Sequence, residues 1–76
     1  MKAQARERII LGIDPGTNIT GYGVIKAIGT VPELIAIGAI DLSKYDDHYI
    51  KLKHIFDRVS GIIEEYHPDE LAIEAP

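Results

Sequence analysis

The sequence predicts a small α/β domain in which a mixed β-sheet carries one long helix. Three segments rich in β-branched and aromatic residues follow one another through short links, as in an antiparallel meander. A stretch of about 20 residues with helical spacing of its apolar positions comes next, and a short apolar segment closes the chain. Because a strand, a long helix and a strand form a crossover unit, the last strand should run parallel to part of the sheet.

The first strand is expected at Arg8–Asp14. Ile9, Ile10, Leu11 and Ile13 form a nearly continuous apolar run there, which suits a central strand covered on both faces. The Asp-Pro-Gly-Thr sequence at 14–17 predicts a type II turn in which Gly16 takes a positive φ.

The remaining elements follow from propensity and spacing. Further strands are predicted at Thr20–Ile28 and Leu34–Leu42, joined by a link that contains Gly29 and Pro32. A helix should then begin after an N-cap at Asp46 or Asp47 and end at His67-Pro68, followed by a strand at Leu71–Glu74. Seven apolar residues form its expected buried stripe: Leu52, Ile55, Phe56, Val59, Ile62, Ile63 and Tyr66.

Strand alternation predicts that two acids share one face of the sheet. The larger apolar residues of the first and last strands (Ile9, Leu11, Ile13, Leu71 and Ile73) should face the helix. Asp14 and Glu74 then lie on the opposite face, each at the C-terminal end of its strand. If the two strands are parallel neighbours, the two carboxylates converge.

The surroundings of these acids indicate metal chemistry. Gly12 and Ala72 precede them on the same face, and Gly21 and Gly23 alternate onto one face of the second strand, so the floor should be shallow and open. Two close carboxylates repel each other unless a cation lies between them. Mg²⁺ prefers carboxylate oxygen, and a pair of such ions about 4 Å apart activates water against a phosphodiester.

Composition limits the alternatives. The 76 residues contain no cysteine, which excludes disulfides and thiolate metal sites and is compatible with a cytoplasmic location. No apolar run approaches the roughly 20 residues of a membrane span. The net charge of −4 counts against strong nucleic-acid binding by this chain alone.

The chain divides into two expected parts. Residues 1–7 are expected to form a flexible leader, and residues 8–76 the folded part. One helix covers only one face, so further helices should follow in a parent protein.

Two motifs resemble those of the RuvC family of Holliday junction resolvases. The sequence GIDPGTNITGYGVI, at residues 12–25, is similar to the opening motif of that family. Ala72-Ile73-Glu74, after the opening Pro68-Asp69, resembles its second acidic motif. The resemblance extends over nearly all of the chain from Arg8 onward.

The resemblance implies a ribonuclease H-like fold, with three antiparallel strands and a fourth strand parallel to the first. It implies that Asp14 and Glu74 are catalytic metal ligands for Mg²⁺, with Mn²⁺ as a possible substitute. It also implies that the remaining acids of the site lie beyond Pro76, so that residues 8–76 form the N-terminal half of the nuclease domain and are inactive alone. The implied partners of the parent protein are four-way junction DNA, a second copy and a branch-migration helicase.

Three other interpretations stay open. An Asp-x-Gly-Thr loop at 14–17 also occurs in actin-like ATPases and sugar kinases, where it holds ATP phosphates. A RuvC-related family linked to RNA processing shares the Gly-Ile-Asp core. A non-enzymatic chain that associates through an exposed sheet face is the third.

Other polar and aromatic residues are expected to have structural roles. A solvated helix face should carry the basic residues Lys51, Lys53, His54 and Arg58. Tyr22 is expected to pack against its neighbours.

Overall fold

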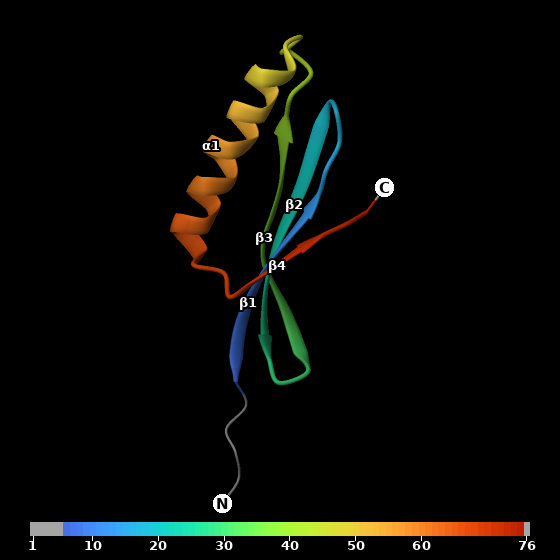
Figure 1. Cartoon of the computed structure of the whole chain (residues 1–76). Coiled ribbons are helices and arrows are strands. Elements are labelled where there is room, and N and C mark those ends of the chain that lie inside the picture. Colours follow the sequence, from blue (N-terminus) through green and yellow to red (C-terminus); the bar gives the residue numbers. More distant parts are fainter. Residues whose placement is uncertain (1–5, 76) are drawn as a thin grey trace, which may run out of the picture.

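The computed structural model describes residues 6–75, which form one mixed sheet and one helix (Figure 1). The sheet has the order β3-β2-β1-β4, in which β1 is antiparallel to β2 and parallel to β4. The predicted α/β fold and its mixed sheet are therefore confirmed. The elements are β1 (Glu7–Asp14), β2 (Ile19–Ile28), β3 (Val31–Asp41), α1 (His48–Tyr66) and β4 (Glu70–Ile73).

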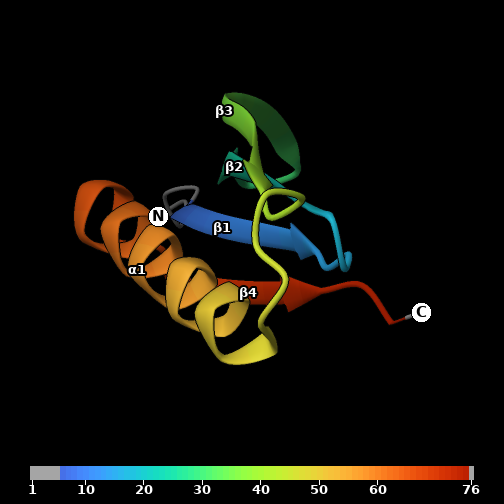
Figure 2. The ribbon, with the colours of Figure 1, turned by 90° about the horizontal axis from the view of Figure 1, so that it is seen from above.

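The core lies between α1 and one face of the sheet. Figure 2 shows α1 running along a single side of the strands. Leu11, Val24 and Ile62 form the buried cluster, with exposed fractions of 1%, 0% and 7%. Val59 and Tyr66 pack against this cluster from the helix. No helix among residues 6–75 combines the length and apolar character needed to cross a membrane.

Both ends of α1 are fixed by local hydrogen bonds. Asp47 is the N-cap, and its side chain accepts a hydrogen bond from the Tyr49 N–H at 2.7 Å. His67 closes the helix in the left-handed region, with φ 49°, and its N–H donates to the Ile63 carbonyl at 2.8 Å. The predicted end at His67-Pro68 is confirmed.

The predicted helical stripe is only partly buried. Leu52, Phe56 and Ile63 are 62%, 71% and 44% exposed. The seven predicted positions span a wider arc than one sheet face contacts, so only part of the arc faces the core. Leu71 and Ile73 are also 56% and 60% exposed, although they were expected to pack on the helix. Among the described residues, the buried cluster and the side chains packed against it come from β1, β2, β3 and α1 and include none from β4.

The turn predictions need two corrections. Gly16 does not have a positive φ, so the predicted type II turn is wrong; among the glycines of residues 6–75, only Gly29 has one, at 61°. Gly16 is required for a different reason, because a Cβ there would collide with the Ile19 carbonyl oxygen. Gly29 and Thr30 form a two-residue hairpin turn, so β3 begins at Val31 and includes Pro32, which an edge strand tolerates.

The start of β1 bears on the predicted leader. Residues 1–5 of that leader lie outside the described part of the chain. At its end, Glu7 already pairs with Ile28, and the Arg6 carbonyl accepts a hydrogen bond from the Gly29 N–H at 3.3 Å. The sheet therefore begins one residue earlier than Arg8.

Candidate functional site

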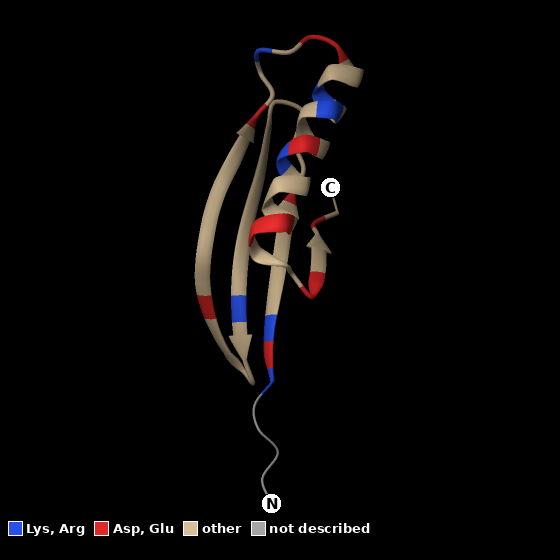
Figure 3. Ribbon diagram, turned by 90° about the vertical axis from the view of Figure 1, so that its left-hand side faces the viewer, with Lys and Arg blue, Asp and Glu red and all other residues tan. Residues whose placement is uncertain are grey.

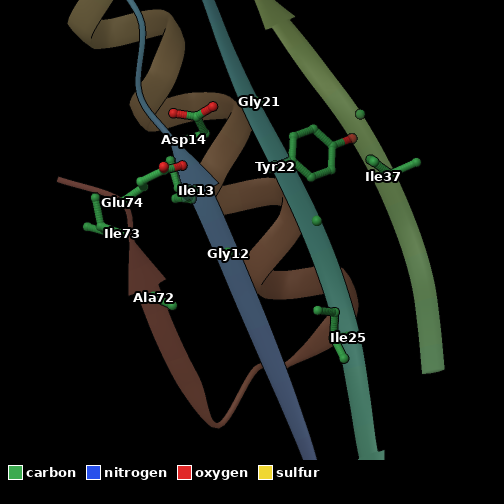
Figure 4. A pocket seen from close by; sticks show the side chains of 12 residues that line it. Gly12, Ile13, Asp14, Gly21, Tyr22, Ile25, Ile37, Ala72, Ile73 and Glu74 are labelled. Atoms are coloured by element: carbon green, nitrogen blue, oxygen red, sulfur yellow. The ribbon is translucent and has the colours of Figure 1, made fainter. Parts of the chain in front are cut away.

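The parallel pairing of β1 with β4 brings Asp14 and Glu74 to the same end of the sheet. Leu11 pairs with Leu71 and Ile13 with Ile73, so the acids occupy the next position on each strand. Glu74 lies one residue beyond β4, but its N–H donates to the Ile13 carbonyl at 3.0 Å and continues the ladder. Figure 4 shows the two carboxylates close together at one end of a pocket.

The register of this pairing is fixed at the opposite end by side chains. Asp69 brackets Ile9: its carboxylate accepts from the Ile9 N–H at 2.8 Å, and its own N–H donates to the Ile9 carbonyl at 2.7 Å. Arg8 and Glu70 form an ion pair at 2.7 Å across the same two strands. A slip of one residue would move Glu74 to the other face, so these contacts hold the acid in place.

The floor beside the acids is made of residues with little or no side chain. Gly12, Gly21, Gly23 and Ala72 line an open hollow of about 560 Å³ together with both acids. Gly12 pairs with Gly23 and Asp14 with Gly21, so these positions share one face. A Cβ at Gly21 would lie 3.9 Å from the Cβ of Asp14. The expected shallow floor is therefore present, on the face away from α1 (Figure 4).

No cation of the described chain neutralises the two acids. The ion pairs within residues 6–75 are Arg8–Glu70, Lys26–Glu7 and Lys53–Asp57, and neither acid takes part in them. Both carboxylates are exposed. The same residues contain no group of three or more His, Cys, Asp or Glu placed to hold a metal. Two exposed carboxylates without a counter-charge fit the oxygen donor set of Mg²⁺, as two ligands rather than a complete cage.

The loop after Asp14 has anchors that sequence reasoning missed. Thr20 is 1% exposed, and its hydroxyl accepts from the Gly16 N–H at 3.4 Å and donates to the Gly16 carbonyl at 3.3 Å. Lys51, from the first turn of α1, donates to the Thr17 carbonyl at 3.0 Å. Thr20 belongs to the opening motif, whereas nothing in the sequence connects Lys51 with this loop.

The other polar and aromatic candidates have structural roles. Tyr22 packs against the Leu11 cluster, as predicted. Figure 3 shows basic and acidic residues mixed along α1, which agrees with a solvated face. Lys53 pairs with Asp57 at 3.0 Å on that face. The pKa of Tyr66 is raised, chiefly by its side-chain hydrogen bond with Glu65, on the helix side of the sheet and away from the acids.

Sequence comparison gives close relatives of known class. Residues 10–75 match the family described as crossover junction endodeoxyribonuclease RuvC. The RuvC proteins of Bacteroides fragilis and Cytophaga hutchinsonii are both 66% identical to this chain, over 71 and 70 residues. These stretches cover 93% and 92% of the chain but only 38% and 35% of the relatives. The chain thus spans just over a third of their length.

A solved structure has the same fold. The chain matches T. thermophilus RuvC, determined in complex with a Holliday junction substrate, with a TM-score of 0.78 and 23% sequence identity. The match covers 91% of this chain and 43% of that one. At this identity it supports the ribonuclease H-like architecture, while the family match rests on the sequence. The chain belongs to the RuvC family.

Proposed function

We propose that this chain supplies two acids, Asp14 and Glu74, to the metal centre of a resolvase that cuts four-way DNA junctions. The observation that carries the proposal is the in-register parallel pairing of β1 and β4, which aligns the acids beside a glycine floor. Membership of the RuvC family connects that geometry with junction cleavage. Because the chain spans 38% of its Bacteroides fragilis relative, the activity is proposed for a protein that contains it.

The chemistry follows from charge and access. A divalent cation, for which Mg²⁺ is proposed with Mn²⁺ as substitute, would neutralise the acids, activate water and stabilise the leaving oxygen. Asp14 and Glu74 would hold it from adjacent strands, with their backbones fixed by the ladder. Gly12, Gly21 and Gly23 would leave room for a phosphodiester backbone to approach the acids.

The geometry gives no support to a phosphate-binding loop of the actin-like type. Such a loop requires free backbone N–H groups that face the nucleotide. The Gly16 N–H is not free, because it donates to the Thr20 hydroxyl. The family match likewise favours RuvC over the RNA-processing relatives. Self-association of the isolated chain through exposed apolar residues stays a prediction. Ile37, for example, is 76% exposed. Light scattering of the isolated chain would test this prediction.

The test uses a full-length hybrid in which residues 1–76 replace the matching segment of the Bacteroides fragilis relative. The hybrid should cut a synthetic four-way junction symmetrically with Mg²⁺. Asp14→Asn and Glu74→Gln should each lower the single-turnover rate by at least about 100-fold and leave junction binding intact.

The matched control is Asp41→Asn. By strand alternation Asp41 lies on the same sheet face as Asp14, but its carboxylate accepts hydrogen bonds from Ser43 at 2.9 Å and 2.6 Å. This variant should cut at the wild-type rate. A folded, dimeric hybrid that binds junctions without cutting them would refute the proposal. The isolated chain should show no cleavage, since two acids form an open site.

The remaining partners belong to the same proposal. A homodimer, contact with a branch-migration helicase and a cytoplasmic location are expected for the protein that contains this chain. Light scattering of the hybrid should give a dimer mass, and a pull-down with the helicase of the relative's own organism tests the second partner.

A further inference from the structure

The loop of residues 15–18 follows directly after Asp14 at the end of β1. Asp14 is the last residue of β1, and its pairing with Gly21 fixes the strand up to that point. Beyond it the chain leaves the sheet at Pro15, which has no N–H to donate. Residues 15–18 are thus the first residues beyond the ladder, next to the acid.

Thr20 holds one part of this loop, residue Gly16, through hydrogen bonds. Its buried hydroxyl bonds both the N–H and the carbonyl of Gly16, which closes the loop on itself. Gly16 also lies against the Ile19 carbonyl so closely that no side chain fits there. The Asn18 carbonyl accepts from the Leu42 N–H at 2.7 Å, which ties the end of the loop to the residue after β3.

Lys51 holds another part of the loop, residue Thr17, through a hydrogen bond. Its ammonium group reaches from α1 to the Thr17 carbonyl at 3.0 Å, and Lys51 is partly buried. A cation in the first turn of a helix lies at the unfavourable end of the helix dipole. The lysine is therefore poorly placed to stabilise α1, and its contact with the loop gives it a different role. Lys53, two residues later, is a useful contrast because it points outward and pairs with Asp57.

We propose that Lys51 is a positioning residue for the metal centre: it holds loop 15–18 and, through the loop, the carboxylate of Asp14. It neither binds the metal nor touches the substrate. The inference rests on the proposed function of Asp14. The proposed role of Lys51 would connect α1 with Asp14 through a hydrogen bond to the loop. The second acid, Glu74, is connected with α1 along the chain, because β4 follows this helix.

The test compares Lys51→Met with Lys51→Arg in the full-length hybrid, with Lys53→Met as the control. The first measurement is amide hydrogen exchange of Gly16, whose N–H in this loop donates to the Thr20 hydroxyl; it involves no metal or DNA. Lys51→Met should raise exchange there at least about fivefold, because the loop loses its anchor at Thr17. Lys51→Arg should restore protection, since a guanidinium can donate to the same carbonyl, and Lys53→Met should resemble wild type.

The second measurement is the response to Mg²⁺. Lys51→Met should raise the Mg²⁺ concentration for half-maximal cleavage about tenfold, as loss of a group that orients a metal ligand does, with the junction dissociation constant unchanged. Calorimetric Mg²⁺ titration of the same variants should show the same order of affinity.

The outcomes separate the two proposals. Unchanged loop exchange in Lys51→Met would overturn the role of Lys51, whatever the activity. Weaker junction binding with an unchanged Mg²⁺ requirement would overturn it as well, and would instead assign Lys51 to phosphate contact. A wild-type hybrid that fails to cut would refute the proposed function, while the exchange data would still decide whether Lys51 anchors the loop.

Discussion

The two faces of the sheet differ in what their side chains do. On the covered face, Leu11 and Val24 are 1% and 0% exposed and pack against α1. On the open face, the same two strands carry Gly12 and Gly23, and the neighbouring Ile37 is 76% exposed. One face holds the fold together, and the other leaves space around two uncompensated acids. Substitutions on the two faces should therefore separate stability from activity.

The largest expected effect is on the covered face. Leu11→Ala should lower the free energy of unfolding of the hybrid by about 2–5 kcal/mol, because it leaves a cavity in the core. Ile37→Ala on the open face should change it by less than about 0.5 kcal/mol. Urea unfolding of both variants measures the difference. Equal losses would mean that the open face is covered in the hybrid and contributes to its core.

The next effect should appear in activity alone. Gly21→Val places a side chain beside Asp14, because a Cβ there lies 3.9 Å from that of the acid. The cleavage rate should fall about 100-fold, equivalent to about 2.7 kcal/mol, since the branched side chain obstructs the floor. Valine suits a strand, so the urea midpoint should stay within error of wild type. Unimpaired cleavage would show that the substrate approaches the acids from elsewhere.

A pair of glycines gives a smaller contrast. A Cβ at Gly38 would lie 2.5 Å from the Tyr22 hydroxyl on the covered face, whereas one at Gly23 has nothing closer than 3.8 Å. Gly38→Ala should cost about 1–2 kcal/mol of stability and Gly23→Ala close to none. In a Tyr22→Ala background the cost at Gly38 should vanish, which a double-mutant cycle measures. A cost that persists without the ring would assign it to the backbone.

The smallest effect concerns a structural acid on the open face. The side-chain hydrogen bond from Ser43, helped by its backbone N–H, lowers the pKa of Asp41 below its ordinary value. A depressed carboxyl pKa gives stability that is present above the unfolded pKa and lost as pH falls through the folded value. Ser43→Ala should raise the pKa of Asp41 toward the ordinary value of an aspartate, as an NMR titration would show. An unchanged value would assign the shift to the backbone N–H.

Sequence reasoning correctly predicted the features that depend on strand alternation and on the order of strands and helix. It failed for features that depend on contacts between residues brought together by the fold. Alternation placed Asp14 and Glu74 on one face, and the crossover rule predicted that the last strand runs parallel to part of the sheet. That it runs parallel to the first strand was implied by the resemblance to RuvC resolvases. The role of Gly16 was missed because its restriction comes from the Ile19 carbonyl and not from its own φ. Helical spacing could not show which part of a wide apolar arc meets the sheet, so Phe56 was wrongly expected to be buried.

The link of Lys51 to the acidic site was also beyond sequence reasoning. Its partner, the Thr17 carbonyl, is 34 positions away along the chain. A backbone carbonyl has no signature in a sequence, so only the placement of α1 against the loop could reveal the contact.

The pairing of β1 with β4 also has a consequence for the order of folding. The hairpins β1–β2 and β2–β3 close over short loops, which takes microseconds. Ile9 and Asp69, which set the register of the parallel seam, are 60 positions apart, so this seam requires closure of a long loop. On a ribosome, three strands can associate before the last one emerges. Under the proposed function, a divalent ion would bind only after that final step and would stabilise it by mass action. The ion would then act as a late folding clamp as well as a catalyst.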